Sequence, residues 1–184
     1  MTRRVLFVQG GGAGAHDHWD DKLAASLERA LGRPYDVRYP RMPDEDDPRF
    51  GAWSAILQRE IAALDADAFL VGHSVGGTIL IHMLAEHPEL LDRIAGVYLI
   101  AAPFVGDGGW PSDDIEAKPN LGARLPGDVA VFLYHGDADE TVPVAHLDLY
   151  ARAITRARAR VLPGRDHQLN NDLSEVARDI LTQD

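Results

Sequence analysis

Cysteine is absent from the 184 residues of this chain. Its absence excludes disulfide bonds, thiolate zinc sites, iron–sulfur clusters and a cysteine nucleophile. Long hydrophobic runs are absent too, because none exceeds Val97 to Ala102, far short of the roughly 20 residues that span a bilayer. The apolar run from Val5 to Val8 is likewise too short for the core of a signal peptide. We therefore expect a cytoplasmic protein with no membrane partner.

Basic residues are scarce relative to acidic ones. The chain has 18 Lys and Arg against 29 Asp and Glu, which gives a net charge of −11. Such a charge repels nucleic acid and anionic membrane surfaces, so we expect a small-molecule substrate and no nucleic-acid partner. With 46% hydrophobic and 26% charged residues, the composition is typical of one globular domain over residues 1–184. Nothing in the sequence indicates an oligomeric state.

Short apolar runs alternate with segments of helical periodicity along the chain. The runs predict six strands, at residues 5–8, 35–39, 68–71, 94–101, 129–134 and 158–162. Helical segments begin near residues 17, 48, 75, 146 and 173. In the first of them, Asp17 is the expected N-cap, and the expected apolar face is Trp19, Leu23, Leu27 and Ala30. This alternation predicts the α/β class, as a three-layer α/β/α sandwich around a mostly parallel six-stranded sheet.

The longest gap between expected strands is the segment 102–128, which is rich in proline and glycine. A loop of this length inside a compact domain usually acts as a lid or a binding segment. We therefore expect residues 102–128 to form a lid-like loop within the single domain.

The stretch Gly72-His73-Ser74-Val75-Gly76-Gly77 carries the most specific signal in the chain. It joins an expected strand directly to an expected helix, which is the setting of the G-x-S-x-G nucleophile elbow. In such an elbow the serine sits on a strained turn that exposes its hydroxyl, and small flanking residues avoid collisions with the neighbouring strand and helix. The helix N-terminus favours an oxyanion there. Ser74 is therefore the candidate nucleophile, with a plain tight turn as the alternative, and His73 is expected to pack beneath the loop.

A base must accompany Ser74, because a serine hydroxyl is a weak nucleophile unless its proton is removed. His167 lies just beyond the expected strand 158–162, and Asp137 and Asp139 lie just beyond 129–134. The carboxyl ends of parallel strands meet at one edge of a sheet, so the serine, an aspartate and the histidine should come together there. Their order along the chain is that of nucleophile-elbow hydrolases.

These motifs resemble those of the α/β-hydrolase superfamily, in particular the small single-domain serine hydrolases typified by retinoblastoma-binding-protein-type hydrolases. The likeness covers nearly the whole chain, from the Gly10 loop to His167 and the closing helix. Family members carry an H-G-x-x-D-x-x-V-P segment for the triad acid, and residues 135–143 match it. The resemblance therefore selects Asp139 over Asp137, which is then a turn-forming residue. It implies a minimal α/β-hydrolase fold without a separate cap domain.

The resemblance also implies an oxyanion hole made by backbone N–H groups. One belongs to Val75, and the other to Gly11 or alternatively Gly12. The family's usual His-Gly dipeptide before this loop reads Gln9-Gly10 here. Since glutamine can also hydrogen-bond, it can brace the loop, and the substitution bears on the geometry of the hole rather than on its existence.

Two aromatic residues of the segment 102–128 are candidates for substrate binding. In the absence of a cap domain, this segment would do what a cap does, with Phe104 and Trp110 lining a pocket for the acyl or the leaving group. The alternative is that the two rings simply attach the loop to the domain.

Three other patterns permit competing interpretations. Residues 10–15 fit the dinucleotide pattern G-x-G-x-x-A, but no carboxylate follows the expected strand 35–39 to bind a ribose. His16 and His18 lack a third ligand at metal-binding spacing. A basic cluster near the last strand is typical of a charged edge strand with Ala157, Ala159 and Val161 facing inward, or alternatively of a partner site; it comprises Arg152, Arg156, Arg158 and Arg160.

Together these observations predict a serine hydrolase, most simply a carboxylic-ester hydrolase, that needs no cofactor or metal and acts on a small acyl ester or related acyl substrate. Ser74 attacks the carbonyl, His167 accepts its proton and later protonates the leaving group, and Asp139 fixes the tautomer of the histidine. Water then hydrolyses the acyl-enzyme. The alternative is a non-catalytic binding or interaction protein on the same fold, since fold alone does not determine function.

Overall fold

Six parallel strands form the central sheet, in the order β2-β1-β3-β4-β5-β6. The computed structural model describes residues 2–126 and 129–183. Its strands are β1 (Arg3–Val8), β2 (Tyr35–Arg38), β3 (Ala68–His73), β4 (Ile94–Ile100), β5 (Ala130–Gly136) and β6 (Arg158–Leu162). The expected parallel sheet is confirmed, and the strand bounds differ from the expected ones by at most two residues at either end.

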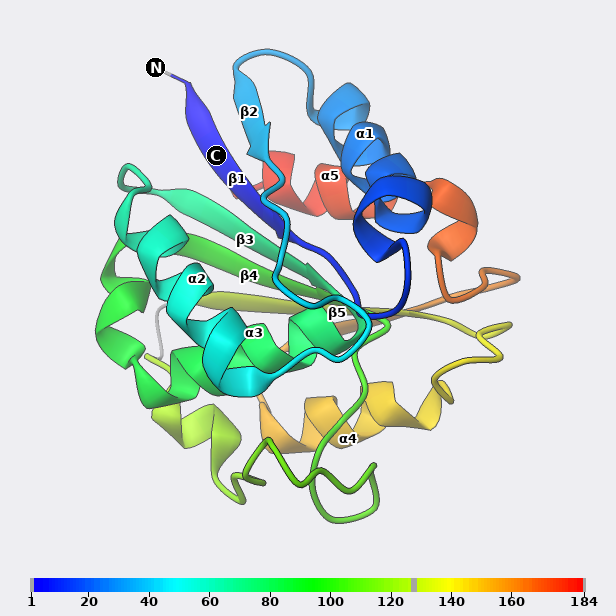
Figure 1. The fold of residues 1–184 in the computed structure, drawn as a ribbon. Helices are drawn as coiled ribbons and strands as arrows, with labels where there is room; N and C mark the ends of the chain where they lie inside the picture. The colour runs from blue at the N-terminus through cyan, green and yellow to red at the C-terminus, as the bar shows by residue number, and fades with distance from the viewer. Residues whose placement is uncertain (1, 127–128, 184) are drawn as a thin grey trace.

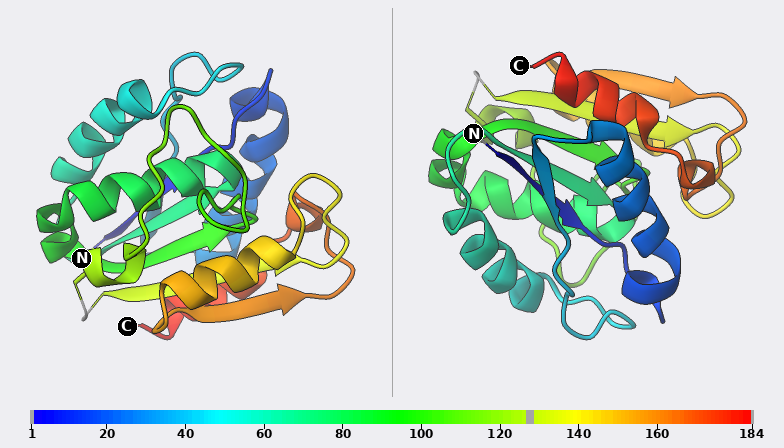
Figure 2. Two further views of the ribbon diagram at one scale, coloured as in Figure 1. Left: turned by 90° about the horizontal axis from the view of Figure 1, so that it is seen from below. Right: turned by 90° about the horizontal axis from the view of Figure 1, so that it is seen from above.

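Helices cover both faces of the sheet, which makes the three layers visible in Figures 1 and 2. On one face lie α1 (Asp20–Leu31) and α5 (Ser174–Leu181), which contact each other. On the other face lie α2 (Phe50–Ala62), α3 (Ser74–Glu86) and α4 (Ala145–Ala153). The apolar residues of β3 alternate between the two layers, because successive side chains of a strand point to opposite faces: Leu70 belongs to the core beneath α3, and Phe69 and Val71 belong to the core beneath α1 and α5.

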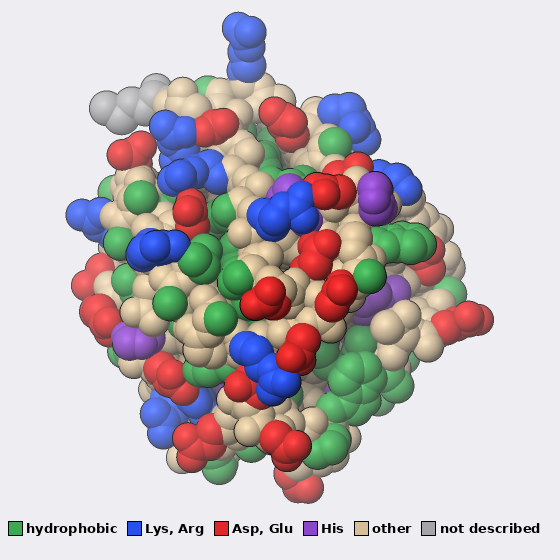
Figure 3. Space-filling model, viewed as in Figure 1, with side chains coloured by type: hydrophobic (Ala, Val, Ile, Leu, Met, Phe, Trp, Pro, Cys, Tyr) green, Lys and Arg blue, Asp and Glu red, His purple; other side chains and the backbone are tan. Residues whose placement is uncertain are grey.

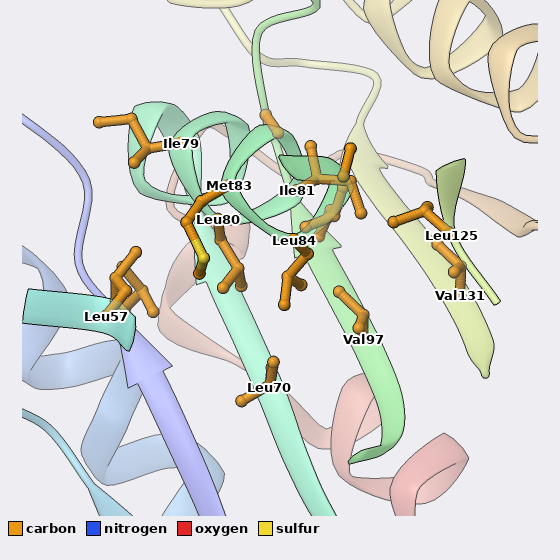
Figure 4. Packing of buried hydrophobic residues seen from close by; sticks show 14 of the residues in the cluster. Leu57, Leu70, Ile79, Leu80, Ile81, Met83, Leu84, Val97, Leu125 and Val131 are labelled. Atoms are coloured by element: carbon orange, nitrogen blue, oxygen red, sulfur yellow. The ribbon is translucent and has the colours of Figure 1, made fainter. Parts of the chain in front are cut away.

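The helix α3 is the most deeply buried element of the α2–α3–α4 layer. Every residue from Gly76 to Ala85 is buried, and Figure 4 shows its side chains packed between the sheet and the neighbouring segments. A helix that is apolar on all sides is a core helix. The residue at its N-terminus, Ser74, is therefore held by a rigid support.

The expected apolar face of the first helix is correct at Leu23 and Leu27 but wrong at Trp19 and Ala30, which are both exposed. A π-helical turn over Ala15–Trp19 precedes α1, so Asp17 does not cap the helix, and Trp19 is 55% exposed. The buried stripe instead begins at Asp20 and continues through Leu23, Leu27 and Leu31. A carboxylate thus occupies a core position, and it does so next to the end of β3.

The strand β6 lies at the edge of the sheet, as the basic cluster suggested. The expectation that Ala159 and Val161 face inward is wrong, because both are exposed. Two arginines of the cluster have structural partners: Arg160 forms two hydrogen bonds to Asp179, and Arg156 donates to four backbone carbonyl groups. Elsewhere, acidic and basic side chains are interspersed over the face in Figure 3.

The segment 102–126 packs along the α3 side of the sheet; Gly127 and Asp128, the last residues of the expected lid-like loop, lie outside the described residues. It is anchored at several points. Thr78 of α3 donates to the carbonyl of Pro103, and the buried Lys118 pairs with Glu86 at 2.8 Å. A short 3-10 helix, Leu121–Arg124, follows. Within the residues described, no helix is long and apolar enough to cross a membrane.

Candidate active site

Ser74 sits on a strained turn between β3 and α3, with a backbone φ of 52°. Few residues other than glycine adopt this left-handed region, and those that do cluster at functional sites. The flanking glycines make the turn fit. A Cβ atom on Gly72 would lie 2.6 Å from the Cα of Gly77, and one on Gly76 would lie 1.9 Å from the carbonyl oxygen of Gln9. The expected need for small residues on both sides of the serine is confirmed.

Three side chains from separate strand ends form a continuous chain of hydrogen bonds. Nε2 of His167 lies 3.0 Å from Oγ of Ser74, and Nδ1 of His167 lies 2.7 Å from Oδ2 of Asp139. Asp137 has a different partner, because its Oδ1 accepts the backbone N–H of Gly164 at 2.6 Å. The structure therefore brings the three residues of the expected triad together and leaves Asp137 in a turn.

The carboxylate of Asp139 is fully shielded from solvent and is surrounded by donors. Its Oδ1 accepts the N–H groups of Thr141 and Val142, both at 2.8 Å, and its Oδ2 lies 3.1 Å from Nε2 of His135. Burial acts to raise the pKa of Asp139, but hydrogen bonds from His135, His167 and Val142 outweigh it and hold the pKa well below the usual range. The group therefore stays ionised and anchors one nitrogen of His167.

The expected oxyanion donors, Gly11 and Val75, lie against each other beside the serine. A Cβ atom on Gly11 would be 2.9 Å from Cγ1 of Val75 and 2.8 Å from Cγ of Pro48. Both residues line the same hollow as Ser74. Val75 also belongs to the first turn of the 13-residue α3, where backbone N–H groups and the helix dipole favour negative charge.

Gln9 braces the glycine loop where a histidine is usual in the family. It is fully buried; its Oε1 accepts the N–H of Met42 at 2.9 Å, and its Nε2 donates to Glu45 at 2.8 Å. Glu45 in turn accepts the N–H groups of Gly14 and His16, both at 3.0 Å. These amides are therefore bound to a carboxylate of the protein itself, which argues against the dinucleotide interpretation of residues 10–15.

Two hollows meet at Ser74. The larger, of about 290 Å³, is mainly apolar, and its lining includes Thr78, Val105, Trp110 and Ile115. The smaller, of about 130 Å³, is lined by His167 and by the exposed Trp19. Of the two expected aromatic residues, the structure therefore brings Trp110 to the site.

Phe104 lies elsewhere. It lines a neighbouring hollow of about 260 Å³ that does not include Ser74, and its ring packs edge-on against Tyr150 at 5.0 Å. Its backbone N–H donates to His146. These contacts fit the alternative expectation for this residue, in which it attaches the loop to the domain.

Two buried polar residues beneath the triad, Asp20 and His73, were not selected as functional from the sequence. Each is 1% exposed, and Oδ2 of Asp20 lies 2.8 Å from Nδ1 of His73. The signal that could have found them is the carboxylate on the apolar stripe of α1, which needs a buried partner. Another histidine, His82, is equally buried, yet neither of its ring nitrogens has a hydrogen-bond partner among the described residues.

Over residues 2–126 and 129–183, no group of three or more His, Asp or Glu side chains is arranged to hold a metal ion. His16 stacks on Tyr39 at 4.2 Å and bonds to Asp17. Its surroundings are those of a surface residue attached to the loop.

The family model for serine hydrolases matches residues 5–167, which include Ser74, Asp139 and His167. YdeN of Bacillus subtilis (strain 168), described as a hydrolase, is 28% identical over 101 residues. That match covers 55% of this chain and 51% of YdeN, so it spans about half the length of the relative.

Solved structures share the fold over nearly the whole chain. The ydeN gene product of B. subtilis superposes with a TM-score of 0.75 at 18% identity, over 99% of this chain and 98% of that one. The CarC enzyme, a serine hydrolase involved in carbazole degradation, gives a TM-score of 0.76 at 16% identity, over 98% and 90% of the two chains. The expected minimal α/β-hydrolase fold is confirmed, and no separate cap domain is evident in the part of the chain described.

Proposed function

The chain belongs to the serine hydrolase family, and we propose that it cleaves small acyl esters through an acyl-enzyme formed on Ser74. The observation that carries this proposal is the unbroken chain of hydrogen bonds from Asp139 through His167 to Ser74. Because the carboxylate fixes the proton of His167 on Nδ1, the other ring nitrogen is free to accept the serine proton.

Acylation begins when Oγ of Ser74 attacks the carbonyl carbon and its proton passes to Nε2 of His167. The carbonyl oxygen becomes an oxyanion, for which the N–H groups of Gly11 and Val75 are the proposed donors; each such donor is worth about 10²–10³ in rate in other hydrolases. The bond to the leaving oxygen then breaks, and His167 gives that oxygen the proton. Water repeats the sequence on the acyl-enzyme and releases the acid.

The two hollows have different roles in this proposal. Since His167 protonates the leaving group, the alcohol must depart on the side of the smaller hollow, which contains this residue. The acyl group then occupies the larger, mainly apolar hollow beside Trp110 and Ile115. Its volume of about 290 Å³ favours short or medium acyl chains. Trp19 borders the leaving-group side.

A fluorophosphonate probe separates the enzyme from a non-catalytic binding protein. We expect stoichiometric labelling of the wild type at Ser74, found by peptide mapping, and no labelling of Ser74→Ala. The matched control is Ser112→Ala, because Ser112 lines the same hollow but has no histidine partner; it should label normally. A folded wild type that stays unlabelled would support the binding protein.

A series of p-nitrophenyl esters of increasing acyl length tests the assignment of the hollows. In Trp110→Ala the preferred chain should become longer, because a wall of the acyl hollow is removed. Phe104→Ala is the control: it should leave the length preference unchanged, since this ring lies outside the hollow. Identical length profiles in Trp110→Ala and the wild type would contradict the assignment.

A further inference from the structure

Beneath the triad lies a second aspartate–histidine pair that the mechanism above does not use. Asp20 is the first residue of α1, and His73 is the last residue of β3, directly before Ser74. The two are 53 positions apart in the chain, yet Oδ2 of Asp20 lies 2.8 Å from Nδ1 of His73, with both side chains shielded from solvent. The pair therefore links the outer helix layer to the base of the nucleophile elbow.

Both ring nitrogens of His73 face hydrogen-bond acceptors. Nδ1 faces the carboxylate of Asp20, and Nε2 lies 3.0 Å from the backbone carbonyl oxygen of His167. A neutral imidazole has one N–H and can satisfy only one of these acceptors, whereas an imidazolium donates to both. The geometry therefore requires a cation at His73 if both contacts are hydrogen bonds.

A protonated Asp20 would be the other way to satisfy the contact at Nδ1. It is disfavoured because Oδ2 of Asp20 also accepts the N–H of Gly10 at 2.6 Å. Such a short distance is typical of a charged acceptor, and a protonated oxygen is a poor acceptor. The pair is thus a buried carboxylate beside a buried imidazolium, with little net charge.

The charges around His73 support the same assignment. Burial is the largest influence on the pKa of His73 and acts to lower it, but the carboxylate of Asp20, the carbonyl of His167 and the charge of Asp139 outweigh burial and raise the pKa. Burial acts to raise the pKa of Asp20, yet His73, Gly10 and the side chain of Gln168 lower it. The ring of His167, with its centroid 4.9 Å away, completes the titratable surroundings of His73.

We propose that Asp20 and His73 are positioning residues, which hold the backbone of His167 and the Gly10–Gly11 loop in place around Ser74 only while His73 carries both ring protons. This inference rests on the proposed hydrolase function. The observation behind it is that a single ion pair links the glycine loop, the backbone of His167 and the serine. Asp20 accepts the N–H of Gly10, and His73 contacts the carbonyl oxygen of His167 and directly precedes Ser74 in the chain.

Loss of one proton from His73 would replace its hydrogen bond to the carbonyl oxygen of His167 by a repulsion. The remaining proton stays on Nδ1, next to the carboxylate, so the lone pair of Nε2 faces the carbonyl oxygen of His167 at 3.0 Å. A displacement of the catalytic base by about 1 Å can cost about 10²-fold in rate. The activity should therefore fall at alkaline pH, as His73 loses this proton.

The phenol of Tyr39 is not expected to produce this alkaline loss. Burial, followed by the charges of nearby carboxylates that include Asp20, raises the pKa of Tyr39 well above its usual value. Its hydroxyl also donates to the carbonyl of His16 at 2.8 Å, so it stays protonated while His73 titrates.

Nuclear magnetic resonance of the wild type, labelled with ¹⁵N-histidine and assigned through the backbone, tests the charge directly. At pH 8, above the ordinary histidine pKa of about 6.5, we expect His73 to retain protons on both ring nitrogens. A His73 with one unprotonated nitrogen at this pH would overturn the proposal. The measurement needs neither a variant nor a substrate.

The pH profile of p-nitrophenyl ester hydrolysis tests the positioning role. In Asp20→Asn, whose His73 lacks the carboxylate, the alkaline limb of kcat/KM should move at least one unit to lower pH, with a loss of about 10-fold to 10²-fold at pH 8. The matched control is Asp21→Asn, which removes the neighbouring exposed carboxylate of α1 and should leave the alkaline limb in place.

An alkaline limb that stays in place in a folded Asp20→Asn would overturn the positioning role. If this variant does not fold, the ring protons of the wild type decide the matter. Failure of the proposed function looks different, because fluorophosphonate would then not label Ser74 while the doubly protonated His73 would still be observed.

Discussion

Two aspartate–histidine pairs lie next to each other in this molecule, and they differ in the third group. In the triad, Nδ1 of His167 lies 2.7 Å from Asp139 and Nε2 lies 3.0 Å from a serine hydroxyl. In the pair below it, Nδ1 of His73 lies 2.8 Å from Asp20 and Nε2 lies 3.0 Å from a carbonyl oxygen. A hydroxyl can give up a proton, whereas a carbonyl can only accept a hydrogen bond. In the two proposals above, the same two side chains thus make a base in one place and a fixed cation in the other.

The largest expected effect concerns the catalytic pair. Asp139→Asn should lower kcat for ester hydrolysis by about 10⁴-fold, because an amide holds His167 in the wrong tautomer. Asp137→Asn is the matched control two residues away; it contacts a backbone N–H of the turn, so its kcat should change only a few-fold. A dead Asp137→Asn together with an active Asp139→Asn would reverse the roles of the two aspartates.

The second prediction contrasts the two pairs in stability. Asp20→Asn leaves a buried imidazolium without its anion, and breaking a buried pair in this way costs about 3–5 kcal/mol of unfolding free energy. His73 has a raised pKa, so its contribution to the free energy of unfolding is complete below about pH 6.5 and is lost as the pH rises through its folded-state pKa. Asp20 has a lowered pKa, so its contribution to the free energy of unfolding is complete above about pH 4 and is lost as the pH falls through its folded-state pKa.

Urea unfolding of the wild type and Asp20→Asn at pH 5.5 and at pH 9 measures this difference. The difference in free energy of unfolding between the two proteins should be larger at pH 5.5 than at pH 9. A gap that is the same at both values would show that the proton of His73 does not contribute to folding. The expected contrast between Asp20→Asn, which lowers stability, and Asp139→Asn, which mainly lowers activity, would then be lost.

The sequence was sufficient to predict that Ser74, Asp139 and His167 come together, but not to find the pair beneath them. Ser74, His167 and Asp139 occupy motifs with local signatures, and the ends of parallel strands must meet at one edge. Asp20 and His73 have no such signature, because only tertiary packing brings α1 against β3. The helical periodicity of the sequence places Trp19 on the core face of α1, but the π-helical turn before the helix leaves it exposed.

Another buried histidine, His82, forms no hydrogen bond to a carboxylate among the described residues. His82 is as buried as His73, but burial, followed by the charge of Lys118, lowers the pKa of His82 to about 4. His82 therefore stays neutral in the folded protein at pH values at which it is protonated in the unfolded chain, that is, below about pH 6.5. Between pH 7 and pH 5 this group alone should cost about 2 kcal/mol of unfolding free energy.

Urea unfolding of His82→Leu at pH 7 and pH 5 tests this expectation. The variant should lose about 2 kcal/mol less than the wild type between the two values, because leucine does not titrate. An equal loss in both proteins would mean that His82 accepts a proton in the folded state. Burial would then not be sufficient to keep a histidine neutral here, and the role given to Asp20 would weaken.

The smallest expected effect belongs to another aspartate–histidine pair, at the surface. Oδ1 of Asp17 lies 2.7 Å from Nδ1 of His16, as close as in the other two pairs, and Asp17 also pairs with Arg41. Hydrogen bonds from Arg41 and then His16 lower the pKa of Asp17 to about 2, so its contribution is present above its ordinary pKa and is lost as the pH falls through about 2. Because Asp17 is exposed, salt screens these interactions.

In Asp17→Asn we therefore expect an unchanged pH profile of kcat/KM and a melting temperature indistinguishable from the wild type at high salt. A loss comparable to that in Asp20→Asn would show that distance, rather than burial and the third partner, sets the strength of these pairs.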